Sequence, residues 1–497
     1  MVVASNATDR LDAIVIGASI EGLFAAASLA AMGKHVAILE ARSSLEDLHE
    51  RDACHVDVDA TMSLDLVSHG LRFGAPPPVV GVSQERSLVI WPDLDATSAS
   101  ISAVSARDAD AFPAFASRLQ RFSVASQGAA QPSLVNWHLA APSRDASSAD
   151  FAYFRGASVS RILEEEFSSP LLRGLLAQLC LAGCSVSPSL PGSAMLMLRH
   201  SLLALLGRER GCRYVAGGTR AVADALLASL KLYNTADVHT GAVVREVLME
   251  RDAVVGVALA DGSIARAPHV ILASAEEETR GLLRKLPVSD VSGGGAANQG
   301  RVRYLVRTPP AVKGVSAALV TSGAAIFLNP GIERLVRAHG ALQSRKLIQD
   351  YCIQLQVCAK PSTEGNVVWV VIVDVPFVPA ETDEGPWNGN RRERFVSAVT
   401  KTIEAWAPGF ELSIEGAELL QPAEARSFME DGTTLPGQAT PPASSRGLAR
   451  LQEEDLSKVG KGLWIVGESL SSGAGRAAQA IARALSPSPR GRVVTDA

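Results

Sequence analysis

A glycine turn between an apolar strand and a helix, close to the start of the chain, constrains the fold more than any other feature of this sequence. Residues 13–16 read Ala-Ile-Val-Ile, a continuous apolar run typical of a parallel strand that is covered on both faces. Residues 17–22 form the turn, residues 23–32 are rich in Ala and Leu and predict a helix, and residues 36–39 predict the next strand. Together they are a strand–helix–strand unit of the kind that binds dinucleotides.

Three positions of the turn and one residue after it are the expected contacts with a dinucleotide. Gly17 makes the tight turn, and Gly22 lets the helix pack closely on the strand. Ser19 stands where the middle glycine of Gly-x-Gly-x-x-Gly lets a pyrophosphate reach the positive end of the helix. Its hydroxyl can donate to a phosphate, or its Cβ can narrow the site. Glu40, 23 residues after Gly17, is placed to accept hydrogen bonds from ribose hydroxyls. The alternative is that the strand–helix–strand unit binds no dinucleotide and serves only as a structural scaffold.

Several segments beyond this unit resemble the phytoene-desaturase-like, FAD-dependent oxidoreductases. The N-terminal unit is similar to the start of that family, and a Gly-Gly segment, an adenine-contacting strand and a final strand with its helix follow in family order. The matching segments are Asp12–Leu23, Val36–Arg42, Tyr214–Leu226, Thr240–Val247, Val254–Ser263, Ala267–Ala273, Gly462–Glu468 and Gly473–Gln479. The order and spacing of these segments carry the resemblance, because Gly-Gly and Asp-Gly pairs are common in ordinary loops.

The resemblance implies an α/β fold with a discontinuous Rossmann-type FAD-binding domain and a second α+β substrate domain. The implied FAD-binding domain comprises residues 1–70, 212–285 and 446–497, and the substrate-binding domain comprises residues 71–211 and 286–445. It also implies that the backbone of Val244 contacts the adenine, and that Gly467 and Glu468 lie near the ribityl or pyrophosphate groups. The implied function is a dehydrogenase or desaturase that passes hydride from a hydrophobic organic substrate to FAD.

Departures from the family pattern gather at the cofactor contacts. Arg42-Ser-Ser stands where relatives carry Arg-x-Gly-Gly, residues 428–438 contain no histidine, and the turn at residues 469–475 is short. A second hypothesis is therefore a non-catalytic relative that has lost FAD and binds a lipid-like ligand or a protein partner. No catalytic residue is identified, since hydride transfer to a flavin asks the protein mainly for orientation and a water-poor site.

Other enzyme classes match the sequence less well. A nicotinamide dehydrogenase could use the same strand–helix–strand unit, but the later segments favour the flavin family. A disulfide reductase would need a cysteine pair, and none of the six cysteines forms a Cys-x-x-Cys motif or has zinc-ligand spacing, so no metal is expected. A serine hydrolase would need a glycine where Glu21 stands.

Composition and hydrophobicity limit partners and location. The formal net charge of −5 gives no basic surplus for nucleic acid. The start of the chain does not read as a signal peptide, and the apolar run at residues 195–207 is too short to span a bilayer, so a cytoplasmic protein is expected. The apolar region 171–206 is interpreted as a buried helical core, or alternatively as a substrate tunnel or a peripheral membrane contact. No feature predicts an oligomeric state.

The region between the matching segments is expected to hold helices and one strong strand. Helices are expected at residues 105–122, 158–166, 171–182, 193–206 and 391–406, and the strand at residues 366–374.

Overall fold

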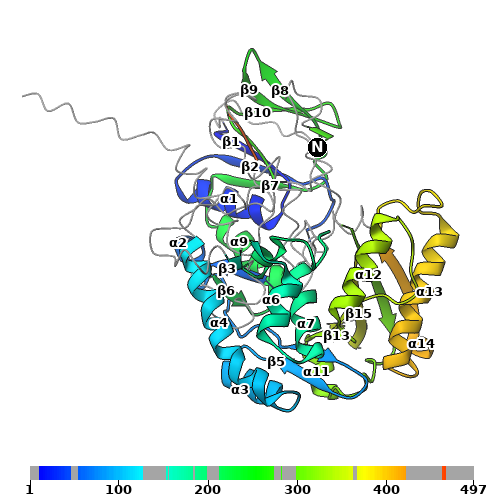
Figure 1. Ribbon diagram of the computed structural model, residues 1–497. Helices are drawn as coiled ribbons and strands as arrows, with labels where there is room; N and C mark the ends of the chain where they lie inside the picture. Colours follow the sequence, from blue (N-terminus) through cyan, green and yellow to red (C-terminus); the bar gives the residue numbers. More distant parts are fainter. Residues whose placement is uncertain are drawn as a thin grey trace, which may run out of the picture.

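The structure is a computed structural model with two main sheets, one above the other in Figure 1. It describes residues 11–45, 54–126, 153–154, 156–182, 185–198, 212–273, 281–282, 298–361, 367–420 and 462–465. The predicted residues Gly467 and Glu468 lie outside these ranges.

The upper sheet is five-stranded and parallel, and it is assembled from distant parts of the chain. Its strand order is β17 (Leu463–Ile465), β11 (Val270–Leu272), β1 (Ala13–Ile16), β2 (Val36–Leu39) and β7 (Ala236–His239). All four neighbouring pairs are parallel, and Ile465, Leu272, Ile16 and Leu39 lie at one level across the sheet. The carboxyl ends of these strands therefore share one edge, as in the predicted Rossmann-type domain.

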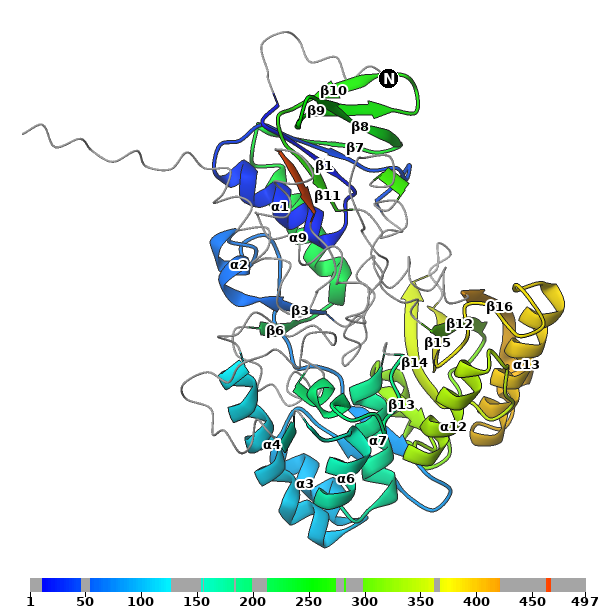
Figure 2. The same cartoon turned by 45° about the horizontal axis from the view of Figure 1, so that its top comes forward.

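Different layers cover the two faces of the five-stranded sheet (Figure 2). Helices α1 (Ile20–Ala31) and α9 (Gly218–Leu230) pack on one face, where their buried side chains form a single cluster with those of β1 and β2. The opposite face is covered by a three-stranded antiparallel sheet of β8 (Val244–Glu250), β9 (Ala253–Leu259) and β10 (Ile264–Arg266). The strands β1 and β2 are thus buried on both faces, which explains their uninterrupted apolar sequence.

The lower sheet has seven strands and forms the core of the second half of the molecule. Its order is β16 (Ile414–Leu420), β12 (Gln299–Val306), β15 (Val367–Pro376), β14 (Ile353–Pro361), β13 (Ala325–Leu328), β4 (Val79–Val82) and β5 (Ser87–Ile90). Its neighbouring strands are antiparallel except for β13 and β4, which are parallel.

Helices pack on both faces of the seven-stranded sheet. Helix α13 (Gly389–Trp406) and the short α14 (Phe410–Ser413) cover what we call the outer face. The inner face packs against α3 (Leu94–Ser102), α4 (Ala106–Ser126), α6 (Val159–Glu166), α7 (Pro170–Leu181), the 3₁₀ helix η2 (Ser193–Leu198) and α12 (Ile332–Gln343). The remaining elements are the ladder of β3 (Cys54–Asp57) with β6 (Cys212–Val215), α2 (Val58–Ser63) and α11 (Ala317–Thr321).

Most of the expected elements are present with small shifts of their ends. The helices α6 and α7 begin where expected because Ser158 and Ser169 accept hydrogen bonds from the backbone N–H groups of Arg161 and Leu172. Of the helix expected at residues 193–206, the described part, Ser193–Leu198, is a 3₁₀ helix, and residues 199–206 lie outside the described ranges. Its Leu196 and Met197 are buried in the cluster around α7, which supports the interpretation as core. Within the described ranges, no helix has both the length and the hydrophobicity that a bilayer crossing requires.

A buried carboxylate joins α4 to the start of α7. Asp108 Oδ1 accepts hydrogen bonds from the backbone N–H and hydroxyl of Ser168, both at 2.8 Å, and Oδ2 accepts one from the N–H of Ser169 at 2.7 Å. Burial opposes ionisation, but these donors outweigh it and hold the pKa of Asp108 below its usual range.

We expect Asp108→Asn to lower the free energy of unfolding at neutral pH by about 1–3 kcal/mol, because an NH₂ group would then face a backbone donor. Urea denaturation measures the effect. Because the folded-state pKa is depressed, the wild type loses this contribution as the pH falls from about 4 through the depressed value, so the difference between the proteins should narrow in acid. Asp110→Asn, an exposed change on the same helix, is the control, and an equal loss there would refute the assignment.

Candidate functional site

The glycine turn lies at the carboxyl edge of the five-stranded sheet. Its two glycines, Gly17 and Gly22, are required for different structural reasons. Gly17 has φ +98°, so the chain turns sharply between β1 and α1, and its N–H still donates to the carbonyl of Leu39 in β2 at 2.8 Å. Gly22 is in the first turns of α1, where an added Cβ would lie 2.4 Å from the carbonyl oxygen of Gly17 and 2.9 Å from the Cβ of Ala273. Only glycine lets α1 approach the sheet this closely.

Ser19 is the N-cap of α1. Its backbone is extended, with φ −61° and ψ 165°, so this position needs no glycine conformation. Its hydroxyl oxygen accepts a hydrogen bond from the backbone N–H of Gly22 at 3.2 Å. The side chain therefore satisfies one of the N–H groups at the positive end of the helix, while its own O–H remains a donor that suits a phosphate oxygen.

Glu40 closes the turn from the neighbouring strand. Its side chain is buried, with Oε2 accepting from the N–H of Ala18 at 2.8 Å and Oε1 accepting from the N–H of Arg42 at 2.9 Å. Each carboxylate oxygen has a second lone pair, so these two bonds fix the carboxylate in place and leave acceptor capacity for hydroxyl groups. The carboxylate is therefore held directly beside the glycine turn.

The segment after β7 completes the neighbourhood of Glu40. The N–H of Gly241 donates to the carbonyl of Arg42 at 2.7 Å, and the N–H of Ala242 donates to that of Glu40 at 2.8 Å. Val244 follows two residues later and pairs with Leu259 across β8 and β9. The carboxyl edge of the five-stranded sheet thus brings together Gly17, Ser19, Gly22 and Glu40. Val244 belongs to β8, the strand that begins beside this edge. The strand β17 ends at the same edge.

A Gly-Gly pair, Gly217 and Gly218, stands at the start of a second helix, α9, beside α1. No role in the site is predicted for this pair from the sequence alone. Gly217 and Gly218 both have positive φ, +89° and +66°, and Gly217 is the N-cap of α9 without a side-chain hydrogen bond. Two consecutive glycines directly before an apolar helix were the available signal for this left-handed entry. The helix α9 packs against α1 on the same face of the sheet.

The residues of the glycine turn and Glu40 fit an adenosine diphosphate group. The tight turn, the close approach at Gly22, the helix N-terminus and the fixed carboxylate are all in place. The Cβ of Ser19 is accommodated as an ordinary N-cap. Among the described residues, no group of three or more His, Cys, Asp or Glu side chains is arranged to hold a metal ion.

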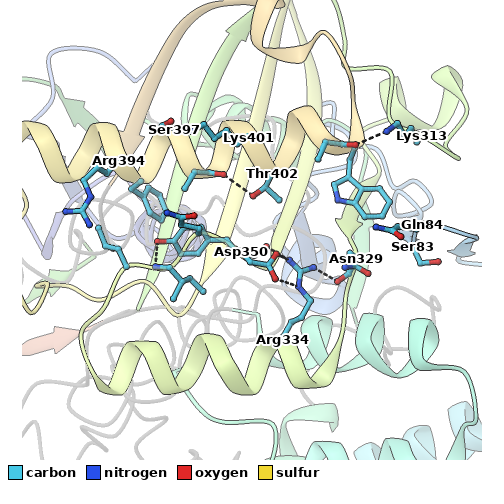
Figure 3. A pocket seen from close by; sticks show the side chains of 18 of the residues that line it. Ser83, Gln84, Lys313, Asn329, Arg334, Asp350, Arg394, Ser397, Lys401 and Thr402 are labelled. Carbon is cyan, nitrogen blue, oxygen red and sulfur yellow. Dashed lines mark hydrogen bonds and ion pairs between the residues drawn. The ribbon is translucent and has the colours of Figure 1, made fainter.

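A large cavity elsewhere has a different character. It measures about 1130 Å³ and lies between α13 and the loop before β14, on the outer side of the seven-stranded sheet (Figure 3). Arg334 is ion-paired with Asp350 and donates to the carbonyl of Asn329, and Lys313 donates to the carbonyl of Ala405 at 2.9 Å. Burial raises the pKa of Tyr351 in its wall to about 12. These groups hold loops to helices, so the cavity is a weaker candidate site than the glycine turn.

Comparisons with known proteins agree with this fold. No protein-family model matches the chain. It is 26% identical to pyridine nucleotide-disulfide oxidoreductase domain-containing protein 2 of Mus musculus, over 84% of this chain and 83% of that protein, and 25% identical to the Rattus norvegicus protein of the same name, over 83% and 81%.

Solved structures of low sequence identity share the architecture over nearly the whole chain. An oxidoreductase from Methanosarcina mazei has a TM-score of 0.57 at 13% identity, covering 95% of this chain and 100% of that one. Putrescine oxidase bound to putrescine has a TM-score of 0.56 at 14% identity, covering 96% and 99%. The predicted fold class, α/β with a Rossmann-type domain and a second α+β part, is thereby confirmed. The domain boundaries given above stay a prediction.

Proposed function

We propose that this protein is a flavin-dependent oxidoreductase that binds FAD at the glycine turn and takes hydride from an organic substrate. The observation that carries the proposal is the Glu40 carboxylate, which is buried and fixed by the N–H groups of Ala18 and Arg42 at the N-terminal end of α1. A buried carboxylate at the end of the second strand is placed to accept hydrogen bonds from the ribose hydroxyls of an adenosine. The relatives named as oxidoreductases and the shared fold support the same proposal.

The chain's own residues have defined tasks in this proposal. Gly17 and Gly22 shape the turn, Ser19 and the first N–H groups of α1 receive the pyrophosphate, and Glu40 holds the ribose. The backbone at Val244 lines the adenine, and Gly467 and Glu468, which follow β17 in the sequence, are assigned to the ribityl or pyrophosphate groups. Bound FAD would supply the hydride acceptor. The substrate domain then has to orient the substrate and exclude water.

A non-catalytic relative is the second candidate, and one observation favours it. The Ser19 hydroxyl already occupies the N–H of Gly22, so the helix N-terminus has less need of a phosphate. Incubating the purified protein with excess FAD, desalting it and recording its absorption separates the two candidates. Retained visible flavin bands support the oxidoreductase. A colourless, correctly folded protein supports the non-catalytic relative.

We expect Glu40→Gln to weaken FAD binding by roughly 10–100-fold, because a hydrogen bond to a charged acceptor contributes about 1.5–3 kcal/mol. The amide would also direct an NH₂ group at the N–H of Ala18 or Arg42. Calorimetric titration of the apoprotein with FAD measures the change in Kd. Glu246→Gln on the exposed side of β8 is the matched control. Equal Kd values for wild type and Glu40→Gln would exclude the proposed role of Glu40.

A further inference from the structure

The inner face of the seven-stranded sheet has two chemically different parts. On β13 and β4 it is apolar: Phe327 and Val79 belong to the cluster around α7, and Leu175 of that helix packs over Gly81. On the neighbouring strands the same face becomes polar. Arg301 of β12 pairs in register with Asp374 of β15, and Asp374 pairs with Gln354 of β14, which pairs in turn with Phe327. Directly paired residues point to one face, so these side chains form a continuous row.

The charges in this row neutralise each other. Arg301 Nε lies 2.8 Å from Asp374 Oδ1, and its Nη2 lies 3.1 Å from Oδ2, a bidentate pair. The two side chains are only 1% and 2% exposed. The pair carries equal and opposite charges, so it does not by itself favour a carboxylate or an ammonium group in a ligand beside the row.

Glutamines next to the pair leave polar atoms without partners in the described part of the chain. Gln354 and Gln356 are each 4% exposed, and Gln354 Nε2 and Gln356 Oε1 make no hydrogen bond, whereas Gln356 Nε2 donates to the carbonyl of Gly323 at 2.8 Å. Natural proteins leave few buried polar atoms unpaired, so a cluster of them indicates a missing partner. The cluster offers both donors and acceptors.

We propose that this face of β12, β15 and β14 binds the uncharged polar head group of an organic molecule, one that presents a hydrogen-bond acceptor and a donor side by side, as a carboxamide does. The acceptor of the head group receives the N–H of Gln354, and its donor reaches the oxygen of Gln356. Its apolar body lies toward β13 and α7. That this molecule is the substrate rests on the proposed oxidoreductase function, whereas its binding does not.

A pair of matched ligands tests the proposal. Benzamide and cumene have the same ring and similar shape, but cumene carries an isopropyl group in place of the carboxamide. Saturation-transfer NMR with each ligand at millimolar concentration on the FAD-free protein should show contact with benzamide, and at least tenfold weaker binding to Gln354→Met. Methionine keeps the length of glutamine and removes its amide. Gln84→Met, at an exposed position in the turn between β4 and β5, is the control and should bind like the wild type.

The melting temperature gives a readout that does not depend on ligand. Removing an unpaired buried amide should raise the Tm of the ligand-free Gln354→Met and Gln356→Met proteins by roughly 1–3 °C. Several results would overturn the proposal: benzamide failing to bind the wild type, benzamide binding both variants as it binds the wild type, stronger binding of cumene, or a lower Tm in both variants.

FAD uptake, measured on the same samples by visible absorbance, keeps this proposal separate from the proposed function. Benzamide binding that depends on Gln354, in a protein that takes up no FAD, supports this site and refutes the oxidoreductase. FAD uptake, together with benzamide binding that is the same in the wild type and in Gln354→Met, supports the oxidoreductase and refutes this site.

Discussion

Asp374→Ala is expected to lower the free energy of unfolding by about 3–5 kcal/mol, because it removes the bidentate carboxylate that faces the buried guanidinium of Arg301. The pair joins two interior strands of the seven-stranded sheet, β12 and β15, which run side by side over eight residue pairs. Desolvation of a charge is the dominant cost there, since neither side chain reaches water. Chemical denaturation followed by intrinsic tryptophan fluorescence measures the loss.

Two further variants separate this effect from the general cost of changing the sheet. Glu415→Ala removes an ion pair with Arg307 on the neighbouring strands, at 3.2 Å but with both side chains well exposed, and should cost only about 0–1 kcal/mol. The double variant Arg301→Met/Asp374→Leu replaces the pair by apolar groups and should recover most of the lost stability. A single variant as stable as Glu415→Ala, or a double variant less stable than the single one, would show that the pair is not a buried charge pair in solution.

The elements around the glycine turn could be predicted because local rules determine them. A four-residue apolar run, a left-handed glycine and an Ala-rich helix need no knowledge of the remaining chain. The position of Glu40 follows from its place at the end of the second strand. What sequence could not decide was the effect of Ser19, because it depends on the direction of one side chain. The structure shows that the hydroxyl turns back to the N–H of Gly22.

The polar row of the seven-stranded sheet was missed for a physical reason. In residues 299–306, Gln299, Arg301 and Arg303 alternate with apolar side chains, a pattern that indicates a strand with one face in water. In the folded chain Gln299 and Arg301 are buried. Their burial depends on the pairing of β12 with β15, whose paired residues lie more than sixty positions apart in the sequence, and on the pairing of β15 with β14. Periodicity within one strand carries no information about such pairing.

Gly22→Ala is the substitution that should affect the candidate cofactor site most. A Cβ at this position would lie 2.4 Å from the carbonyl oxygen of Gly17, a backbone atom that cannot move without opening the turn. We expect a loss of about 1–3 kcal/mol in the free energy of unfolding from overpacking, and a loss of FAD binding because α1 is pushed away from β1. Thermal denaturation and calorimetric titration with FAD measure the two effects.

A second helical glycine provides a control that isolates the close approach from helix propensity. Gly340 lies in α12, is exposed, and has no atom within 4 Å of an added Cβ. Alanine there should stabilise the protein by about 0.5–1 kcal/mol, since glycine is a poor helix former. The two substitutions are chemically identical, so their opposite signs would be due to the contact with Gly17 and Ala273 alone. If Gly22→Ala also stabilised the protein, or left FAD binding unchanged, α1 would have to lie farther from the sheet than the structure places it.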